Sequence, residues 1–214
     1  MTYLMQGEQF QVKAILFDLD GTIIDTEPLA ASVVRFFLKK WKIKHNSGDL
    51  REVVGKTWKV AIHEHYKRFQ FPVSERAVLS SMLERYQELL KKKITLIPGA
   101  VRAVRLLSHQ FTLGLVSGSN SEEVHWILKK LNIKKYFSVI LCAEDYNHSK
   151  PSPAGYLKAM RLLGVNPGET LIFEDSEAGI KSGTRSGAWV VAVSHANHFG
   201  QDQSLAHVKI KNFL

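Results

Sequence analysis

Short apolar runs recur along the chain, each about the length of one β-strand. None shows the alternation of apolar and polar residues that marks a strand with one face in water. Uninterrupted runs of this kind are typical of strands buried on both faces, as in a parallel sheet. The pattern predicts five such strands and, after a loop, a last short strand at 207–210. The five strands are expected at 13–17, 111–116, 138–142, 170–173 and 188–193.

Amphipathic segments with helix-start and helix-stop residues lie between the later runs. Asn120 or Ser121 can cap one helix, because a short polar side chain there can accept from the free N–H groups of the first turn. Ser152 and Pro153 open another helix, and Gly164 is a typical stop. A chain that alternates strand and helix predicts an α/β fold with a Rossmann-like parallel sheet.

Residues 25–95 follow a different pattern, with helical periodicity and no strand-like run. We therefore predict a smaller all-helical domain inserted after the first strand. Its helices are expected at 29–41, 56–69 and 74–92. The expected domains are an α/β core formed by 1–24 and 96–214 and a helical cap formed by 25–95.

The composition is that of a globular protein, with 45% hydrophobic and 23% charged residues in a chain of 214. The one cysteine, Cys142, excludes an internal disulfide framework and fits a reducing compartment, so we expect a cytoplasmic protein. Residues 1–11 lack the basic and apolar regions of a secretory signal. No apolar stretch has the length of a membrane span, and we expect no membrane association.

Positive charge is concentrated in the predicted cap. Residues 25–95 hold 15 Lys and Arg against 8 Asp and Glu, whereas the rest of the chain holds 14 against 12. Three explanations remain open: attraction of a phosphorylated substrate, binding of nucleic acid, or a solvated surface. No recognised nucleic-acid-binding motif accompanies the charge, so we do not expect a nucleic-acid partner.

Polar side chains follow the predicted strands at or near the point where each strand ends. The carboxyl ends of parallel strands meet at one edge of the sheet, where open α/β sheets bind their ligands. We therefore expect these side chains to converge. They are Asp18, Ser117, Glu144, Asp145, Lys150, Glu174 and Asp175.

The carboxylates of this set indicate a metal site. Asp18, Glu174 and Asp175 supply hard oxygen ligands, which suit Mg²⁺ better than softer metals. The sequence offers no cluster of His and Cys for zinc. A magnesium ion would also lower the repulsion between an anionic phosphate and an anionic nucleophile.

The same residues suggest a reaction. The Asp18 carboxylate can attack phosphorus to form an aspartyl phosphate. Ser117 can donate to a phosphoryl oxygen, and Lys150 can offset its charge. Asp20 lies two residues after Asp18 and points to the same side of an extended chain, so it can protonate the leaving oxygen and later deprotonate water.

Four motifs in order give the chain a family resemblance. Together they look like the motifs of the haloacid-dehalogenase-like superfamily, in the branch that contains β-phosphoglucomutase and phosphoglycolate phosphatase-like enzymes. The resemblance spans nearly the whole chain and includes a helical cap at 25–95. The motifs are Asp18-Leu19-Asp20-Gly21-Thr22 with Asp25-Thr26-Glu27, Ser117-Gly118-Ser119-Asn120, Lys150-Pro151-Ser152-Pro153, and Phe173-Glu174-Asp175-Ser176 with Ala178-Gly179-Ile180.

This resemblance implies roles for individual residues. It implies Asp18 as nucleophile and Asp20 as acid and base, with Lys150 as the third catalytic residue. Mg²⁺ would be held by Asp18, the Asp20 carbonyl and Asp175, with Glu174 beside them. A Rossmann-like sheet with strand order 5-4-1-2-3 is expected. The expected phosphate-binding residues are Leu19, Asp20, Ser117, Gly118 and Lys150.

Two departures from the resemblance concern the cap. β-Phosphoglucomutases carry a histidine twelve residues after the nucleophile, where this chain has Ala30. They also carry an arginine three residues after a cap-loop glycine; aligned on Gly55, this chain has Trp58, with Lys56 and Lys59 as candidate substitutes. Without these side chains, water becomes the favoured acceptor of the phosphoryl group.

The sequence therefore predicts a Mg²⁺-dependent phosphatase that acts on a small phosphorylated metabolite in a cleft between core and cap. Phosphoryl transfer of the β-phosphoglucomutase type is one alternative. A binding or regulatory protein that kept the fold and lost turnover is another. We expect a monomer or a weak dimer.

Overall fold

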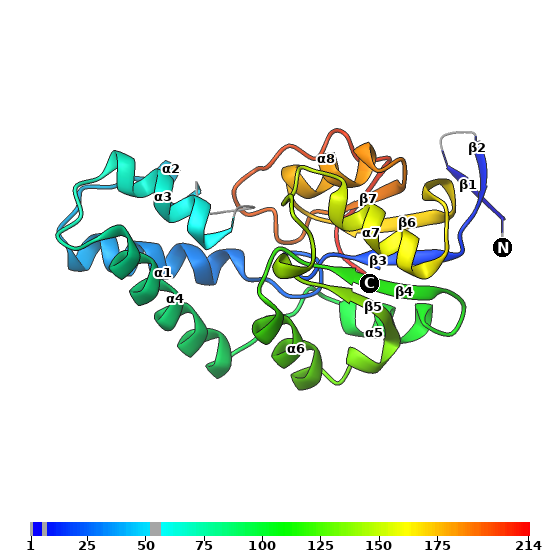
Figure 1. The fold of residues 1–214 in the computed structure, drawn as a ribbon, viewed down its shortest axis with the longest axis horizontal. Coiled ribbons are helices and arrows are strands. Elements are labelled where there is room, and N and C mark those ends of the chain that lie inside the picture. The colour runs from blue at the N-terminus through cyan, green and yellow to red at the C-terminus, as the bar shows by residue number, and fades with distance from the viewer. Residues whose placement is uncertain (1, 6–7, 52–56) are drawn as a thin grey trace. The chain divides into compact units, whose positions relative to one another are not determined.

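The computed structural model describes residues 2–5, 8–51 and 57–214 and divides into two compact units (Figure 1). One unit comprises Met1–Ile24 and Leu96–Leu214, and the other comprises Asp25–Thr95. The chain begins with an antiparallel pair, β1 (Thr2–Met5) and β2 (Glu8–Gln11), which the apolar runs did not predict.

A parallel sheet forms the centre of the first unit. Its order is β5-β4-β3-β6-β7-β8, and every neighbouring pair is parallel. All four residues of β3 are buried, as the uninterrupted apolar run predicted. The strands are β3 (Ala14–Phe17), β4 (Thr112–Val116), β5 (Phe137–Leu141), β6 (Thr170–Glu174), β7 (Trp189–Val193) and β8 (Val208–Ile210).

The α/β class is confirmed, but the strand order differs from the expected one. The first five strands follow the expected order when it is read from the opposite edge. The sheet is larger by β8, which extends it beyond β7. The three residues of β8 carry no long apolar run, and as the edge strand β8 pairs with β7 alone.

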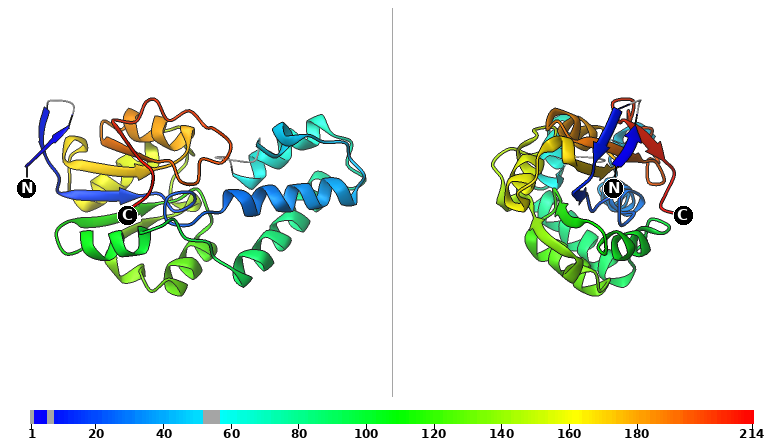
Figure 2. Two further views of the ribbon diagram at one scale, coloured as in Figure 1. Left: turned by 180° about the vertical axis from the view of Figure 1, so that it is seen from behind. Right: turned by 90° about the vertical axis from the view of Figure 1, so that its right-hand side faces the viewer.

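Helices cover both faces of the sheet (Figures 1 and 2). Parallel strands need right-handed crossovers, so a reversal in strand order moves the connecting helices to the other face. Accordingly, α5 and α6 lie on one face, and α7 and α8 lie on the other with the core that includes Leu16, Tyr156 and Ile172. The helices are α5 (Ala100–Leu107), α6 (Ser121–Lys130), α7 (Ala154–Leu163) and α8 (Glu177–Arg185), with short 3₁₀ turns at Lys134–Tyr136, Ala143–Asp145 and Pro167–Glu169.

Among its described residues, the regular elements of the second unit are all helices. The short helix α2 was not predicted, whereas α3 and α4 begin at the side-chain caps Thr57 and Ser74. His65 of α3 is buried and bonds the carbonyls of Ala61 and Asp49, both at 2.8 Å, so it ties α3 to α2. The helices are α1 (Glu27–Lys40), α2 (Ser47–Arg51), α3 (Trp58–Arg68) and α4 (Glu75–Lys92).

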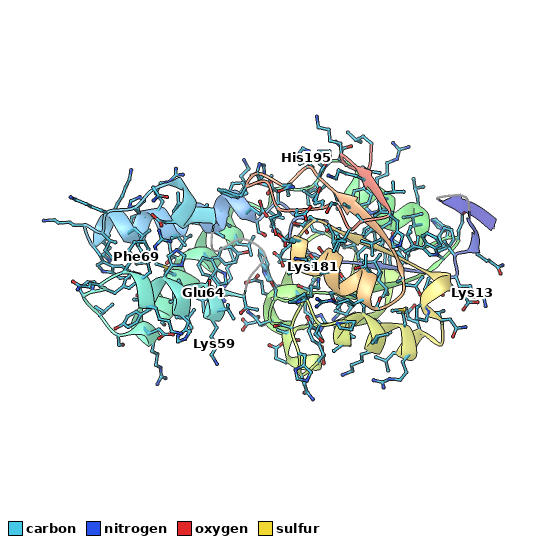
Figure 3. The ribbon with its side chains drawn as sticks, turned by 90° about the horizontal axis from the view of Figure 1, so that it is seen from above. Lys13, Lys59, Glu64, Phe69, Lys181 and His195 are labelled. Carbon is cyan, nitrogen blue, oxygen red and sulfur yellow. The ribbon has the colours of Figure 1, made fainter. Side chains whose placement is uncertain are left out.

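The exposed face of α3 carries Lys59 and Glu64 (Figure 3). Trp58 packs against Tyr86 of α4, with ring centroids 5.2 Å apart. The expected cap-loop residues Gly55 and Lys56 lie outside the described residues. Across the described helices, none combines the length and apolar character needed to cross a membrane.

A narrow stem joins the inserted segment to the chain. In the first unit, Ile24 pairs antiparallel with Leu96, and the Ile97 N–H donates to the Ile23 carbonyl at 3.0 Å. The two ends of the insertion therefore leave the sheet side by side.

Candidate active site

The ends of three neighbouring strands bring the predicted polar residues together. Asp18 directly follows β3, Ser117 directly follows β4, and Glu174 ends β6 with Asp175 next. The ladder continues past the strands, because Asp18 N–H donates to Phe173 O at 3.0 Å and Ser117 N–H donates to Leu141 O at 2.9 Å. The backbone of each site residue is thus held by the sheet, and all four side chains are buried.

The Lys150 ammonium lies between two carboxylates. It contacts Asp18 Oδ1, donates to Glu174 Oε1 at 2.7 Å, and donates to the Val116 carbonyl at 3.2 Å. These three acceptors match the three N–H donors of an ammonium group. Burial lowers the pKa of Lys150, but the charges of Asp18 and Glu174 together outweigh burial and raise it well above 10.5. Lys150 is therefore a permanent cation of the site.

Glu174 holds this cation in place. Its Oε1 accepts from Lys150 and, at 3.1 Å, from the Tyr156 hydroxyl. Its Oε2 accepts from the N–H groups of Asp175 and Ser176 at 2.8 and 3.0 Å and from Ser176 Oγ at 3.1 Å. The Lys150 Nζ also lies 5.1 Å from the centre of the Tyr156 ring, a cation–π arrangement. Both oxygens of Glu174 accept from protein donors, so its observed contacts anchor Lys150 beside the expected metal site.

The surroundings of Asp18 disfavour the charged form of its carboxyl group. Burial raises the pKa of its carboxyl group, Lys150 opposes that rise, and the nearby Glu174 and Asp20 carboxylates add to it. One lysine does not balance three carboxylates in a water-poor site. A bound divalent cation would favour the charged form of Asp18, the form that can attack phosphorus.

A tight turn after Asp20 packs Gly21 and Thr22 against Asp175. Gly21 has φ 79°, and its N–H donates to Ile24 O at 2.6 Å. A Cβ on Gly21 would lie 2.0 Å from Asp175 Oδ2, so only glycine permits this approach. Thr22 Oγ1 donates to Asp175 Oδ1 at 3.2 Å. The turn that follows Asp18 is therefore packed directly on the Asp175 carboxylate.

The donor set at this point fits a hard cation. Asp18, Asp175 and the Asp20 main-chain carbonyl could hold Mg²⁺, which prefers oxygen ligands and often keeps water or substrate phosphate in its remaining positions. Within the described part of the chain, no three side chains of His, Cys, Asp or Glu gather into a complete metal cage. An open, partly solvated magnesium site is consistent with both observations.

The loop after β4 presents the expected phosphate donors. Ser117 Oγ accepts from the Ser119 N–H at 3.0 Å, and its own proton remains able to donate. Gly118 is exposed, and a Cβ there would meet nothing within 4 Å, so its main chain is open to a ligand. Leu19 has a fully buried side chain, which leaves only its main chain for a phosphate contact.

Two acidic residues expected at this edge have other roles. Glu144 accepts from the Ser121 N–H at 3.1 and 3.2 Å, at the start of α6. Asp145 Oδ2 accepts from the Cys142 N–H at 2.8 Å, so it closes its own turn. Both act on local backbone, and the structure does not bring them to Asp18.

Several contacts in the site involve residues that no sequence pattern predicted. Tyr156 bonds Glu174, and Gln203 Nε2 donates to the Asp175 carbonyl at 2.6 Å from a loop 28 residues away. Ser119 Oγ donates to Asp20 Oδ2 at 2.8 Å. A tyrosine in a helix or a glutamine in a loop carries no pattern that identifies such a partner.

Known proteins resemble this chain over most of its length. Residues 15–193 match the family model described as haloacid dehalogenase-like hydrolase. A phosphoglycolate phosphatase from Aquifex aeolicus is 31% identical over 186 residues, which cover 82% of this chain and 82% of that protein. A fructose-1-phosphate phosphatase from Escherichia coli is 26% identical over 180 residues, covering 84% of this chain and 95% of that protein.

Solved structures share the fold. The crystal structure of a β-phosphoglucomutase from Clostridium difficile has a TM-score of 0.78 at 21% identity. The match covers 95% of this chain and 92% of that one. This likeness concerns the arrangement of helices and strands.

Proposed function

Because the chain belongs to the haloacid dehalogenase-like hydrolase family, we propose that it is a Mg²⁺-dependent phosphatase that acts on a small phosphorylated metabolite. Phosphatase is the activity named for its relatives from A. aeolicus and E. coli. One observation supports the proposal above others: a buried carboxylate, Asp18, is held by a lysine that a second carboxylate anchors. This is the arrangement that a nucleophile for an anionic substrate requires.

In the proposed reaction, an Asp18 oxygen forms a bond to phosphorus while the ester P–O bond breaks. Asp20 gives its proton to the leaving oxygen, and an aspartyl phosphate on Asp18 remains. Asp20 then takes a proton from water, whose oxygen attacks phosphorus and releases inorganic phosphate and free Asp18.

Other residues of the chain bind and neutralise the phosphoryl group. Lys150, Ser117 and the main chain at Gly118 offer positive charge and N–H or O–H donors to its oxygens. Mg²⁺, when bound at Asp18, Asp175 and the Asp20 carbonyl, supplies positive charge that reduces the repulsion between nucleophile and substrate.

Water is the proposed acceptor of the phosphoryl group. The histidine and arginine that the mutase pattern requires are replaced by Ala30 and Trp58. In the structure, Ala30 has no polar side chain to offer, and Trp58 is the first residue of α3 and packs on Tyr86. Neither can hold a second phosphate by charge. The excess of basic residues at 25–95 is compatible with an anionic substrate.

Release of phosphate from 4-nitrophenyl phosphate and from a panel of sugar and short-chain phosphates tests the proposal. We expect activity that needs Mg²⁺ and that Asp18→Asn abolishes. Glu169→Gln is a matched control, because Glu169 is a half-buried carboxylate outside the site, paired with Lys13 at 2.5 Å. Absence of Mg²⁺-dependent release across the panel would favour a binding or regulatory protein. Full activity in Asp18→Asn would exclude the proposed nucleophile.

The mutase alternative has its own test. β-Glucose 1-phosphate is incubated with the protein, and glucose 6-phosphate and free phosphate are measured together. Hydrolysis faster than conversion supports the phosphatase, and conversion faster than hydrolysis would replace it with the mutase.

A further inference from the structure

Ser119 makes a contact that the reaction above leaves unexplained. Its hydroxyl donates to Asp20 Oδ2 at 2.8 Å, although the two residues are 99 positions apart in the chain. We propose that Ser119 is the positioning residue of the general acid: it fixes the Asp20 carboxyl group in the orientation that delivers a proton to the leaving oxygen. This inference rests on the proposed function and adds a residue to it.

The loop that carries Ser119 is held on both sides. Its N–H donates to Ser117 Oγ at 3.0 Å, and its carbonyl accepts from the Ala143 N–H at 3.0 Å. The next residue, Asn120, caps α6 by accepting from the Glu123 N–H at 2.9 Å. The Ser119 hydroxyl on this loop has a fixed position. Its hydrogen bond therefore restricts the Asp20 side chain more than it restricts Ser119.

The backbone of Asp20 is also fixed by hydrogen bonds of the turn around it. The carbonyl of Leu19 accepts from the N–H groups of Ile23 and Ile24 at 2.9 and 3.1 Å, and Gly21 N–H bonds Ile24 O. A proton donor gains rate from correct placement, and a misplacement of about 1 Å can cost on the order of 100-fold. The Ser119 bond restrains the Asp20 carboxyl group against such a misplacement.

Glu123 is a second carboxyl group beside Ser119. Glu123 lies in hydrogen-bonding reach of Ser119 and in electrostatic contact with Asp20. Burial, with the Asp20 charge, raises the pKa of Glu123 to about 8. A hydroxyl has one proton and cannot serve two carboxylates. In the structure that proton lies on the 2.8 Å contact with Asp20 Oδ2.

Substrates that differ in their need for a proton test this inference. Leaving 4-nitrophenolate needs no proton, whereas an alkoxide needs one as the P–O bond breaks. The parameter kcat/KM reports only the steps up to the phosphorylation of Asp18, so later hydrolysis does not obscure the comparison. We expect Ser119→Ala to lower kcat/KM by roughly 10- to 100-fold for glycerol phosphate and by less than about threefold for 4-nitrophenyl phosphate. Ser119→Thr, which keeps the hydroxyl, should restore most of the loss.

A double-mutant cycle distinguishes positioning from general damage. With glycerol phosphate, Ser119→Ala should add no further loss to Asp20→Asn, because the group that it positions has already been removed. Ser108→Ala is the control: its hydroxyl bonds the Arg105 carbonyl after α5, before β4 begins, and should change neither substrate.

Each outcome is decisive. Equal losses for both substrates in Ser119→Ala, or losses that multiply with those of Asp20→Asn, would overturn the positioning role while the phosphatase remains. If the wild-type protein releases no phosphate from either substrate, the proposed function fails first and the positioning role falls with it.

Discussion

At Gly179 of α8, helix propensity favours alanine whereas the tertiary packing requires glycine. Alanine is the better helix former, so Gly179→Ala would stabilise an isolated helix by about 1 kcal/mol. In the structure, however, a Cβ at this position would lie 1.6 Å from Glu174 Oε1, 1.9 Å from its Cδ and 2.3 Å from its Oε2. Ordinary contact begins at 3.4 Å, so the carboxylate would have to retreat by 1.8 Å.

That retreat would break the contacts that hold the centre of the site. Glu174 bonds Lys150 at 2.7 Å, Tyr156 at 3.1 Å and the Asp175 N–H at 2.8 Å. Hydrogen bonds that involve a charged group contribute roughly 1.5–3 kcal/mol each, so loss of two costs about 3–6 kcal/mol. After the helix gain is subtracted, we expect Gly179→Ala to lower the free energy of unfolding by about 2–5 kcal/mol.

Urea unfolding followed by circular dichroism measures this change. Gly168→Ala is the control, because a Cβ there meets nothing within 4 Å, and we expect it to change stability by less than about 0.5 kcal/mol. Glu174→Ala gives a second check, since removing the carboxylate makes room for the new methyl group. In that background Gly179→Ala should cost nothing. A single variant as stable as the wild type would refute the reasoning.

Two further predictions concern a titration and a loop. Glu123 has a pKa of about 8 in the folded protein and near 4.5 in the unfolded chain. As the pH rises between those values, this group lowers the free energy of unfolding by up to ~1.4 kcal/mol for each pH unit. Glu123→Gln should therefore stabilise the protein more at pH 7.5 than at pH 5 in urea unfolding, and a difference independent of pH would contradict this. Gln203 is buried and bonds the carbonyls of Asp175 and Val193 at 2.6 and 3.3 Å, so Gln203→Leu should weaken Mg²⁺ binding about 10-fold in titration calorimetry. Gln110→Leu, at an exposed position, should bind Mg²⁺ as the wild type does, and equal affinity in both variants would remove Gln203 from the support of the site.

The fold class and the shared edge of the site could be predicted from the sequence, because both follow from the pattern of apolar runs. A run buried on both faces must end where the chain leaves the sheet, and parallel strands leave at the same edge. Asp18, Ser117 and Asp175 accordingly follow the ends of three neighbouring strands. β8 was expected as a strand but not as part of this sheet, since nothing in three residues specifies a neighbour.

The contacts inside the site could not be predicted from the sequence, because they depend on which face of each helix points inward. In α7 the apolar Leu157 is 43% exposed, whereas Tyr156, which carries a polar hydroxyl, is buried beside Lys150. A helix displaced by one residue rotates by about 100° and exchanges the partners of a site. Likewise, five protein donors, some adjacent and some distant in sequence, bond to the Glu174 carboxylate, and no sequence pattern predicted this arrangement.

The stem formed by Ile24 and Leu96 has a consequence for what the core can tolerate. Since the two ends of the insertion leave the sheet side by side, the core must close a loop whatever lies between them. The entropy of closing a loop grows only logarithmically with its length, at about 0.6 kcal/mol for each doubling. A segment of 71 residues (25 to 95) is therefore a small thermodynamic burden on the strands that carry Asp18 and Asp175. Insertions of other lengths and sequences could be exchanged at this stem while the chemistry at the strand ends stays unchanged.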